Sequence, residues 1–440
     1  MRWMAPAAGL ALALAAPASA AEIRLSGQMR ARVEMIDGQV RPGFAERDII
    51  VALRTILSAE IEMGALTFAG EVRDSRVYLQ EPDSAVSDRD VNVLEPVRLE
   101  LRIDLREAAP GGGDARLVLG RQLLGIGSNR LIDPPDYRNA TNAFTGLKLE
   151  ARRGPWIIEA AWAMPQQRLP SDREEVRQNR FALDREGLDR QIWAVHLFRE
   201  DAIGPVGAGL TYVGFREEDR PGRPTRNRHL HTLGPWLLRM PAPGRFDLDA
   251  EAFLQWGRIR ASAAEPAPDC DVLAGFARLE VGTSLKGAWH PCLSFRIDWA
   301  SGDRPGDRFE RFDRLFGSRV ADFAVSGQYA AVGRANILSP GLRLAGTRGG
   351  TDFYVTARLL WADSATDSFS TTGVQDPTGA SGHFAGAQVE GRARHWLRRD
   401  RLRLETAFVV LFRDGLLTDA PNAPPGRTLV YLAPALVASF

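Results

Sequence analysis

Residues 23–35 read Ile23-Arg24-Leu25-Ser26-Gly27-Gln28-Met29-Arg30-Ala31-Arg32-Val33-Glu34-Met35. Every odd position in this run is apolar or small, and every even position is polar or charged. Side chains alternate between two faces in this way only in an extended strand, so the run predicts a β-strand with one apolar and one polar face. The pattern returns at 97–106, where apolar residues alternate with charged ones. A sheet of a soluble protein and the wall of a membrane barrel both fit this pattern.

The segment 1–20 has the features of a secretory signal peptide. Arg2 supplies a positive start, residues 10–16 an apolar stretch and Ala18-Ser19-Ala20 a small-residue cleavage site. We therefore expect a leader at 1–20 and a mature chain at 21–440 that leaves the cytoplasm. No later stretch approaches the ~20 consecutive apolar residues of a membrane helix. If the mature chain lies in a membrane, it must do so as a barrel. The final Phe440 resembles the terminal aromatic residue read by the barrel assembly machinery of the outer membrane.

The charges are balanced, with 56 basic and 55 acidic residues, which gives no reason to expect a nucleic-acid partner. Lys148 and Lys286 are the only lysines, so almost all the basic residues are arginine. A GC-rich genome would produce this bias by itself. Alternatively, guanidinium groups line a channel and hold carboxylates through paired hydrogen bonds.

Eighteen segments have the alternating or apolar pattern of strands. They lie near 23–36, 48–62, 66–75, 94–107, 114–123, 144–153, 156–164, 190–199, 206–215, 229–240, 246–259, 272–285, 292–301, 338–346, 352–362, 386–397, 401–412 and 427–440. Short turns such as 63–65, 154–155 and 398–400 alternate with long polar connections such as 76–93, 165–189 and 302–337. This alternation is typical of an outer-membrane barrel with tight periplasmic turns and long outer loops. We predict one domain over 21–440, an all-β, 18-stranded antiparallel transmembrane barrel with both termini on the periplasmic side. Tryptophans near predicted strand ends, at 156, 162, 256, 299, 361 and 396, fit interfacial girdles.

Few residues suggest catalysis or metal binding. Only His229 and His231 share a strand face among the histidines, and no third ligand is identifiable nearby, so no metal and no cofactor are predicted. The sequence has no nucleophile elbow and no phosphate-binding loop, and we predict that the protein is not an enzyme. Cys270 and Cys292 fall near opposite ends of the predicted barrel wall, too far apart for a disulfide, so two free thiols are expected.

Several polar segments are more specific. Gly120-Arg121-Gln122 is followed by Arg130 and then by Arg138-Asn139-Ala140-Thr141-Asn142-Ala143-Phe144. Further along the chain come Asp298, Ala300-Ser301-Gly302-Asp303 and Gly333-Arg334-Ala335-Asn336, and an earlier segment reads Arg73-Asp74-Ser75-Arg76. Together these segments resemble the alginate export family of outer-membrane β-barrels over nearly all of the mature chain.

The resemblance implies an eighteen-stranded barrel with an arginine-rich constriction, through which an anionic polysaccharide passes outward. It implies cationic contacts from Arg121, Arg130 and Arg138 and neutral hydrogen-bond partners in Asn139 and Asn142. Further pore-lining candidates are Arg73, Arg76 and Arg334, and a loop motif is expected at Asp298, Ser301, Gly302 and Asp303. A ring of positive side chains in a narrow pore selects anions.

Several alternatives remain open from the residues themselves. Arg98, Arg102 and Arg106 stand beside Glu100 and Asp104, so the alternative for a lumenal arginine is to pair within the wall instead of contacting substrate. The 302–337 connection either folds inward as a plug or forms an outer wall. The leading prediction is a monomeric, anion-selective export channel of the bacterial outer membrane, whose partners are membrane lipid, an acidic polysaccharide or small anions, and periplasmic export machinery. The rivals are a porin for uptake of small anionic solutes and a loop-based adhesin or barrel enzyme.

Overall fold

A computed structural model describes residues 21–106, 113–264, 266–319, 322–325 and 327–440. The predicted signal peptide lies outside these residues. The elements are β1 (Glu22–Asp37), β2 (Arg47–Met63), β3 (Leu66–Tyr78), β4 (Asn92–Asp104), β5 (Asp114–Gln122), β6 (Phe144–Arg153), β7 (Trp156–Pro165), α1 (Arg173–Arg177), β8 (Arg190–Ile203), β9 (Val206–Glu217), β10 (His229–Arg239), β11 (Phe246–Arg260), β12 (Asp269–Ser284), β13 (Cys292–Ala300), β14 (Arg308–Phe309), β15 (Ile337–Arg348), β16 (Thr351–Trp361), β17 (Phe384–Arg398), β18 (Leu402–Arg413), α2 (Leu416–Asp419) and β19 (Thr428–Ser439).

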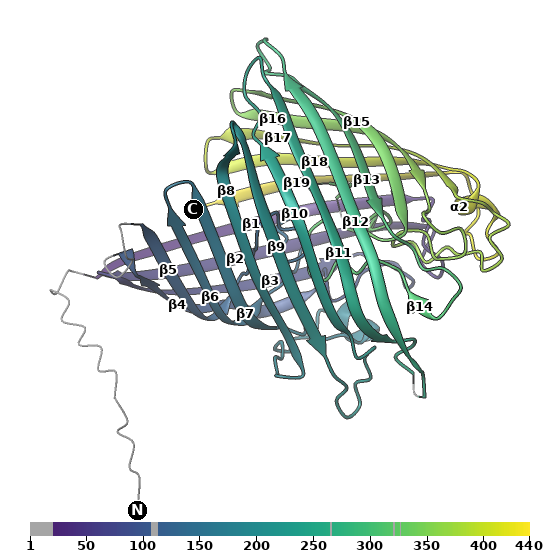
Figure 1. The fold of residues 1–440 in the computed structure, drawn as a ribbon, viewed down its shortest axis with the longest axis horizontal. Coiled ribbons are helices and arrows are strands. Elements are labelled where there is room, and N and C mark those ends of the chain that lie inside the picture. Colours follow the sequence, from purple (N-terminus) through teal and green to yellow (C-terminus); the bar gives the residue numbers. More distant parts are fainter. Residues whose placement is uncertain (1–20, 107–112, 265, 320–321, 326) are drawn as a thin grey trace, which may run out of the picture.

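The sheet closes on itself as a barrel. Each long strand pairs antiparallel with its neighbour along the wall, and β1 pairs with both β2 and β19. The two-residue β14 lies within a loop and pairs in parallel with β12, which leaves the eighteen wall strands that the sequence predicted. Figure 1 shows the C-terminus at the same end as tight turns, with α2 and β14 at the other end. We take the end with the termini as periplasmic, as in other outer-membrane barrels.

The two helices are short. Helix α1 has five residues and α2 has four, and both lie in loops. No helix in the described ranges is long and apolar enough to cross a membrane.

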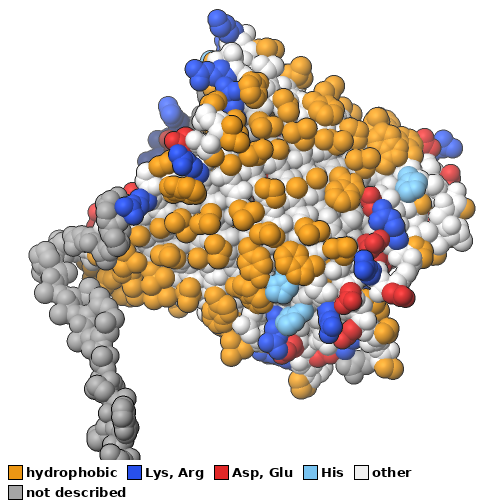
Figure 2. All heavy atoms as spheres, viewed as in Figure 1, with side chains coloured by type: hydrophobic (Ala, Val, Ile, Leu, Met, Phe, Trp, Pro, Cys, Tyr) orange, Lys and Arg blue, Asp and Glu red, His pale blue; other side chains and the backbone are white. Residues whose placement is uncertain are grey.

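The alternation seen in the sequence sorts side chains between the two faces of the wall. Leu25 and Leu99 point outward and are 76% and 70% exposed, whereas Arg32, Glu34 and Arg54 point into the lumen and are buried. Figure 2 shows hydrophobic side chains covering a broad belt of the outer surface, with many of the charged groups gathered towards its ends. The wall therefore presents an apolar surface to lipid and a charged surface to the lumen.

Aromatic side chains gather on the outward-facing surface near the extracellular end of β8 to β11. The ring of His231 stacks on Trp256 at 5.7 Å between centroids and lies 6.3 Å from Trp193. Its Nδ1 is 2.7 Å from the hydroxyl of Tyr212. This arrangement matches the interfacial girdle expected for tryptophan and gives His231 an aromatic, interfacial setting.

The two cysteines lie at opposite ends of the wall. Cys270 is the second residue of β12, and Cys292 pairs with Ser284, the last residue of that strand. At ~3.3 Å per residue, most of the strand length separates them. Both thiols are free, as predicted.

Candidate functional site

Two long loops fold into the lumen and meet there. The 123–143 loop connects β5 to β6, and the 301–336 loop connects β13 to β15. Ile132 and Phe316 form a parallel bridge between them, and the amide of Phe316 donates to Leu131 O at 3.0 Å. A Cβ on Gly317 would lie 1.7 Å from the carbonyl oxygen of Arg130, so only glycine allows this approach. The 302–337 connection therefore forms part of an inward-folded plug and not an outer wall.

The 301–336 loop reaches across the barrel to distant strands. Phe316 packs edge-on against Phe144 of β6 and Phe215 of β9, with centroids 5.4 and 5.6 Å apart. The amide of Gln328 donates to Glu34 of β1 at 2.8 Å. These contacts hold the loop against the wall on several sides and leave its arginines inside the lumen.

A buried ion network joins the two loops to the wall. Arg130 contacts Asp322 at 2.9 Å, Glu251 at 2.7 Å and Asp249 at 2.5 Å. Arg278 and Arg334 bind the same Asp322. Burial alone would raise the pKa of Asp322, but the three arginines hold it well below its usual range. Every charge in this network therefore has a fixed partner of opposite sign.

Arginines on the lumenal wall have partners within their own strands. Arg73 contacts Glu71 at 2.6 Å, and Arg102 contacts Glu100 at 2.7 Å. Residues two apart in a strand share a face, which brings these side chains together. Arg98 and Arg102 also bind Glu60 of β2, at 2.7 and 3.1 Å. Wall stiffening by ion pairs, the alternative left open by the sequence, is the arrangement at these positions.

A second group of arginines lies in the loops and has no such partners. We call Arg41, Arg89, Arg138, Arg314 and Arg319 the arginine cluster. None of the five makes an ion pair within the described part of the chain; Arg41 and Arg319 bond backbone carbonyls, at Gln328 O (3.1 Å) and Val332 O (3.3 Å). Arg41, Arg89, Arg138 and Arg319 line a cavity of only about 20 Å³, room for roughly one water molecule.

The guanidinium groups of the arginine cluster repel one another. Burial lowers the pKa of Arg138 and of Arg319, and the neighbouring guanidinium groups of Arg89 and Arg314 lower both further. Guanidinium groups nevertheless stay charged in proteins. The only carboxylate lining the same cavity is that of Asp90, and burial raises its pKa to about 6. The cluster is therefore an excess of positive charge held in a narrow space.

With this geometry established, comparison with known proteins identifies the family. The model of the alginate export family matches residues 21–418. This chain belongs to the alginate export family. No curated protein matches the sequence.

Solved outer-membrane porins share the fold of this alginate export family member. A BenF-like porin from Pseudomonas fluorescens Pf-5 has a TM-score of 0.60 at 11% identity, with 95% of this chain and 99% of that chain covered. OccK5 (OpdH) from Pseudomonas aeruginosa has a TM-score of 0.56 at 12% identity over 95% and 98% of the two chains. OccAB1 from Acinetobacter baumannii has a TM-score of 0.56 at 11% identity over 95% and 96%. Family and fold are those of a channel of the bacterial outer membrane.

The asparagines expected as substrate contacts serve as anchors. The amide nitrogen of Asn139 donates to the carbonyls of Leu53, Arg76 and Asp90, and its oxygen accepts from Arg30. Asn142 donates to Asp133 O and Phe316 O and accepts from Arg168. Both amides are fully occupied in holding the 123–143 loop in place.

Arg130 and Arg334 are likewise occupied. Both bind Asp322, and Nη1 of Arg334 also donates to Ser318 O at 2.5 Å. Of the three arginines on which the family resemblance placed cationic contacts, Arg138 alone lies in the arginine cluster.

Arg76 faces outward, whereas Arg121 lies at the rim near the end of β5 and its guanidinium binds Glu95, the cross-strand partner of the lumenal Arg73. Arg76 pairs across the sheet with the outward-facing Leu53. Direct cross-strand partners share a face. Arg121 bridges Glu95 and Glu186, and Arg76 binds Asp74 at 2.9 Å. Both arginines therefore stabilise the outer rim of the wall.

The expected loop motif forms the start of the 301–336 loop. Asp298 lies in the lumen and binds Arg278 at 2.7 Å. The hydroxyl of Ser301 donates to Glu310 O, and a carboxylate oxygen of Asp303 accepts from the amide of Glu310. A Cβ on Gly302 would lie 2.1 Å from Asn336 Oδ1. These residues shape a turn that directs the loop into the lumen.

No motif in the sequence singles out four members of the arginine cluster: Arg41, Arg89, Arg314 and Arg319. A usable signal exists, because none of them has an acidic residue two positions before or after it. Most wall arginines named above do have one.

Proposed function

We propose that this protein is an anion-selective channel that carries an acidic, alginate-like polysaccharide outward across the outer membrane. The observation that carries the proposal is the arginine cluster, a group of lumenal cations without ion-pair partners among the described residues. Membership of the alginate export family supports the substrate class and the outward direction.

The proposed mechanism is electrostatic attraction followed by short-lived contacts. A guanidinium group can hold a carboxylate through two parallel hydrogen bonds. Several arginines held close together let a carboxylate pass from one to the next, so that the polymer is drawn in and still released. Burial raises the pKa of the neighbouring Asp90 and Asp133 to about 6, so protonation below that pH removes negative charge that opposes an incoming anion.

Passage of a sugar chain requires movement of the plug. The cavity among Arg41, Arg89, Arg138 and Arg319 has a volume of about 20 Å³ and cannot hold a pyranose ring, so the loops that line it must shift to admit one. Periplasmic export machinery is the proposed source of the polymer.

The test is single-channel recording in planar bilayers, with the reversal potential measured under a salt gradient. The variant Arg138→Gln/Arg319→Gln removes two charges from the arginine cluster. We expect its anion-to-cation permeability ratio to fall several-fold, and an oligouronate that blocks the wild-type current to lose potency.

The matched control is Arg76→Gln/Arg121→Gln, which removes two arginine charges that carboxylates already neutralise. Its selectivity should stay at the wild-type value. Equal losses in the two double variants would mean that the cluster does not select ions. Ready passage of small carboxylates without block by an oligouronate would favour the uptake porin.

A further inference from the structure

A cavity of about 520 Å³ lies at the periplasmic side of the plug, against β7 to β10. Its lining includes Gly127 of the 123–143 loop, the periplasmic turn residue Pro205 and the lumen-facing aromatic residues His196, Phe198 and Trp236. Its volume falls within the ~300–1,000 Å³ typical of small-molecule sites. The cavity is thus the space that a molecule entering from the periplasm would meet directly below the plug.

The three aromatic rings pack against one another and form what we call the aromatic platform, in which His196 and Phe198 are buried and Trp236 is partly exposed. The centroids of Phe198 and Trp236 are 5.2 Å apart, and those of His196 and Trp236 are 5.9 Å apart. His196 and Phe198 stack at 6.1 Å with an interplanar angle of 19°. The rings come from β8 and β10, two strands separated by β9.

Hydrogen bonds fix this platform in position. Nε1 of Trp236 donates to Asp249 at 2.9 Å, and Asp249 in turn binds Arg130 of the plug. Nδ1 of His196 is 2.9 Å from the hydroxyl of Thr211. Gly127 approaches so closely that a Cβ would lie 2.9 Å from that same Nδ1. The platform is therefore preorganised and linked to the plug.

The charged groups around the cavity differ in their pairing. The carboxylates of Glu159 and Glu200 are neutralised by Lys148 at 2.9 Å and Arg152 at 2.5 Å. Arg239 and Arg245 also line the cavity, and neither forms an ion pair within the described ranges; the guanidinium of Arg239 lies 4.0 Å over the ring of Phe246. The cavity therefore combines an apolar floor with cations available at its edge.

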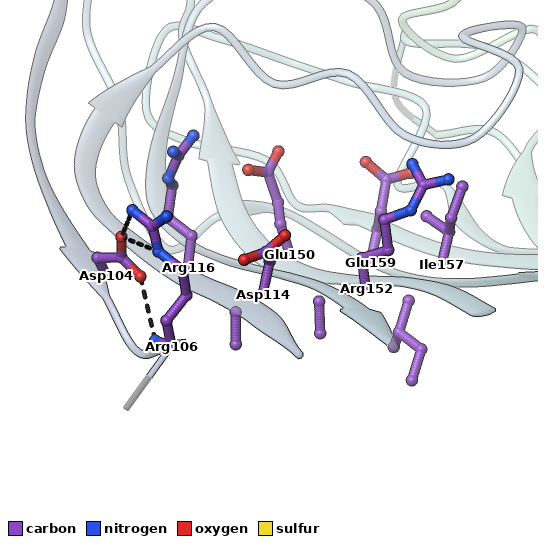
Figure 3. Close-up of a pocket in the computed structure, with 11 residues that line it drawn as sticks. Asp104, Arg106, Asp114, Arg116, Glu150, Arg152, Ile157 and Glu159 are labelled. Carbon is purple, nitrogen blue, oxygen red and sulfur yellow. Dashed lines mark hydrogen bonds and ion pairs between the residues drawn. The ribbon is translucent and has the colours of Figure 1, made fainter. Parts of the chain in front are cut away.

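A second cavity lies beside the one at Trp236 and has a different lining. It has a volume of about 420 Å³ and shares Ile157 and Glu159 with the aromatic cavity. Figure 3 shows its acidic and basic side chains close together, with Asp104 bonded to Arg106. Its lining contains no aromatic residue. Of the two cavities, only the one at Trp236 offers a surface for stacking a ring.

We propose that the Trp236 cavity is a loading subsite for one uronate unit of the polysaccharide, an inference that rests on the proposed function. The C–H face of a pyranose ring is apolar and complements the electron-rich face of an aromatic ring. Arg239 and Arg245 bind the carboxylate, and the carboxylates of Glu159 and Glu200 accept hydrogen bonds from the ring hydroxyls. The subsite holds the leading sugar beneath the plug before it reaches the arginine cluster.

The test is calorimetric titration of the full-length purified protein with an oligouronate. Trp236→Leu and Trp236→Phe both lose the hydrogen bond to Asp249, but only the phenylalanine variant keeps an aromatic face. We expect Trp236→Leu to weaken binding about fivefold or more, and Trp236→Phe to recover most of that loss. Arg239→Gln/Arg245→Gln should lower the preference for the uronate over a neutral hexose oligomer of the same length.

The control is Trp256→Leu, on the outward-facing aromatic girdle, which should bind as the wild type does. Equal weakening in Trp236→Leu and Trp236→Phe would make the indole an anchor for Asp249 and overturn the subsite. Tighter binding of benzoate than of the uronate would overturn it as well. If the wild-type channel is neither anion-selective nor blocked by the oligouronate, the proposed function itself fails; if both properties hold and Trp236→Leu binds normally, the subsite alone fails.

Discussion

Arginines on the barrel wall and arginines in the lumenal loops share a chemistry but differ in how they are neutralised. On the wall, Arg73 and Arg102 find acids two residues away in their own strands. In the arginine cluster, Arg138 and Arg319 form no ion pair within the described chain and are surrounded by other guanidinium groups. Whether a lumenal arginine can attract a passing anion therefore depends more on its ion-pair partner than on its location.

The plug contains a third arrangement that falls between these two. Arg130 has no acid two positions away, yet it is neutralised by Asp322 and by wall residues of β11. Tertiary contacts have supplied the partners that the local sequence lacks. Loop arginines therefore divide into those that lock the plug and those that remain available.

The largest effect should come from removing the shared acid of the plug. Asp322→Asn leaves Arg130, Arg278 and Arg334 without their common carboxylate. Breaking one buried ion pair costs about 3–5 kcal/mol. We expect the plug to loosen, so that single-channel conductance and current noise both rise and protease cuts the 301–336 loop faster.

Asp307→Asn makes the same substitution at an exposed position of the same loop and should leave conductance unchanged. An unaltered conductance in Asp322→Asn would show that the network does not hold the plug, and the distinction between locked and available arginines would be lost.

A smaller effect should follow from pH. Burial raises the pKa of Asp90 to about 6, so this carboxyl gains a proton as the pH falls from 7.5 to 5. Loss of one negative charge beside the arginine cluster should raise the anion-to-cation permeability ratio about twofold or more. Because the pKa is raised on folding, the stability contributed by Asp90 is present below pH ~4 and is lost as pH rises through ~6.

Asp90→Asn should show the high selectivity already at pH 7.5 and a weaker pH dependence. Part of that dependence should remain, since burial also raises the pKa of Asp133 to about 6. The reversal potential at several pH values measures both. A ratio that falls on acidification would contradict the assignment.

The smallest effect should come from the wall. Glu100→Gln removes one partner of Arg102 but leaves Glu60 in contact at 3.1 Å. Because Arg102 keeps one carboxylate partner, we expect selectivity to rise by less than about twofold. Asp74→Asn, in the outward-facing pair with Arg76, is the control. A change as large as that from the arginine cluster would erase the difference between the two regions.

The strands could be predicted closely because each carries its own period-two signal. The eighteen predicted strands all exist, and the boundaries of most differ by only a few residues. The faces of some arginines could not be predicted so well. Leu117, Val118 and Leu119 are apolar at both parities, so the face of Arg121 on β5 had no local marker. Arg73 and Arg76, in contrast, lie three positions apart, and a regular strand cannot turn both inward.

The plug could not be built from the sequence for a different reason. No periodicity governs the 123–143 and 301–336 loops, and their contacts depend on which strands lie opposite each other once the barrel has closed. The segments shared with the family marked the right loops, but the roles of Asn139, Asn142 and Arg334 as anchors follow from tertiary hydrogen bonds. Their fully used polar groups are visible only in three dimensions.

The bond between Arg130 and Asp322 joins residues 192 positions apart in the chain. Contacts of such long range form late in folding, because closing a long loop loses conformational entropy before the contact can form. The pairing that closes the barrel is of longer range still, because Gln28 of β1 lies opposite Ser439 of β19. The joining of the two loops and the closure of the wall around them therefore both belong to the last stage of folding.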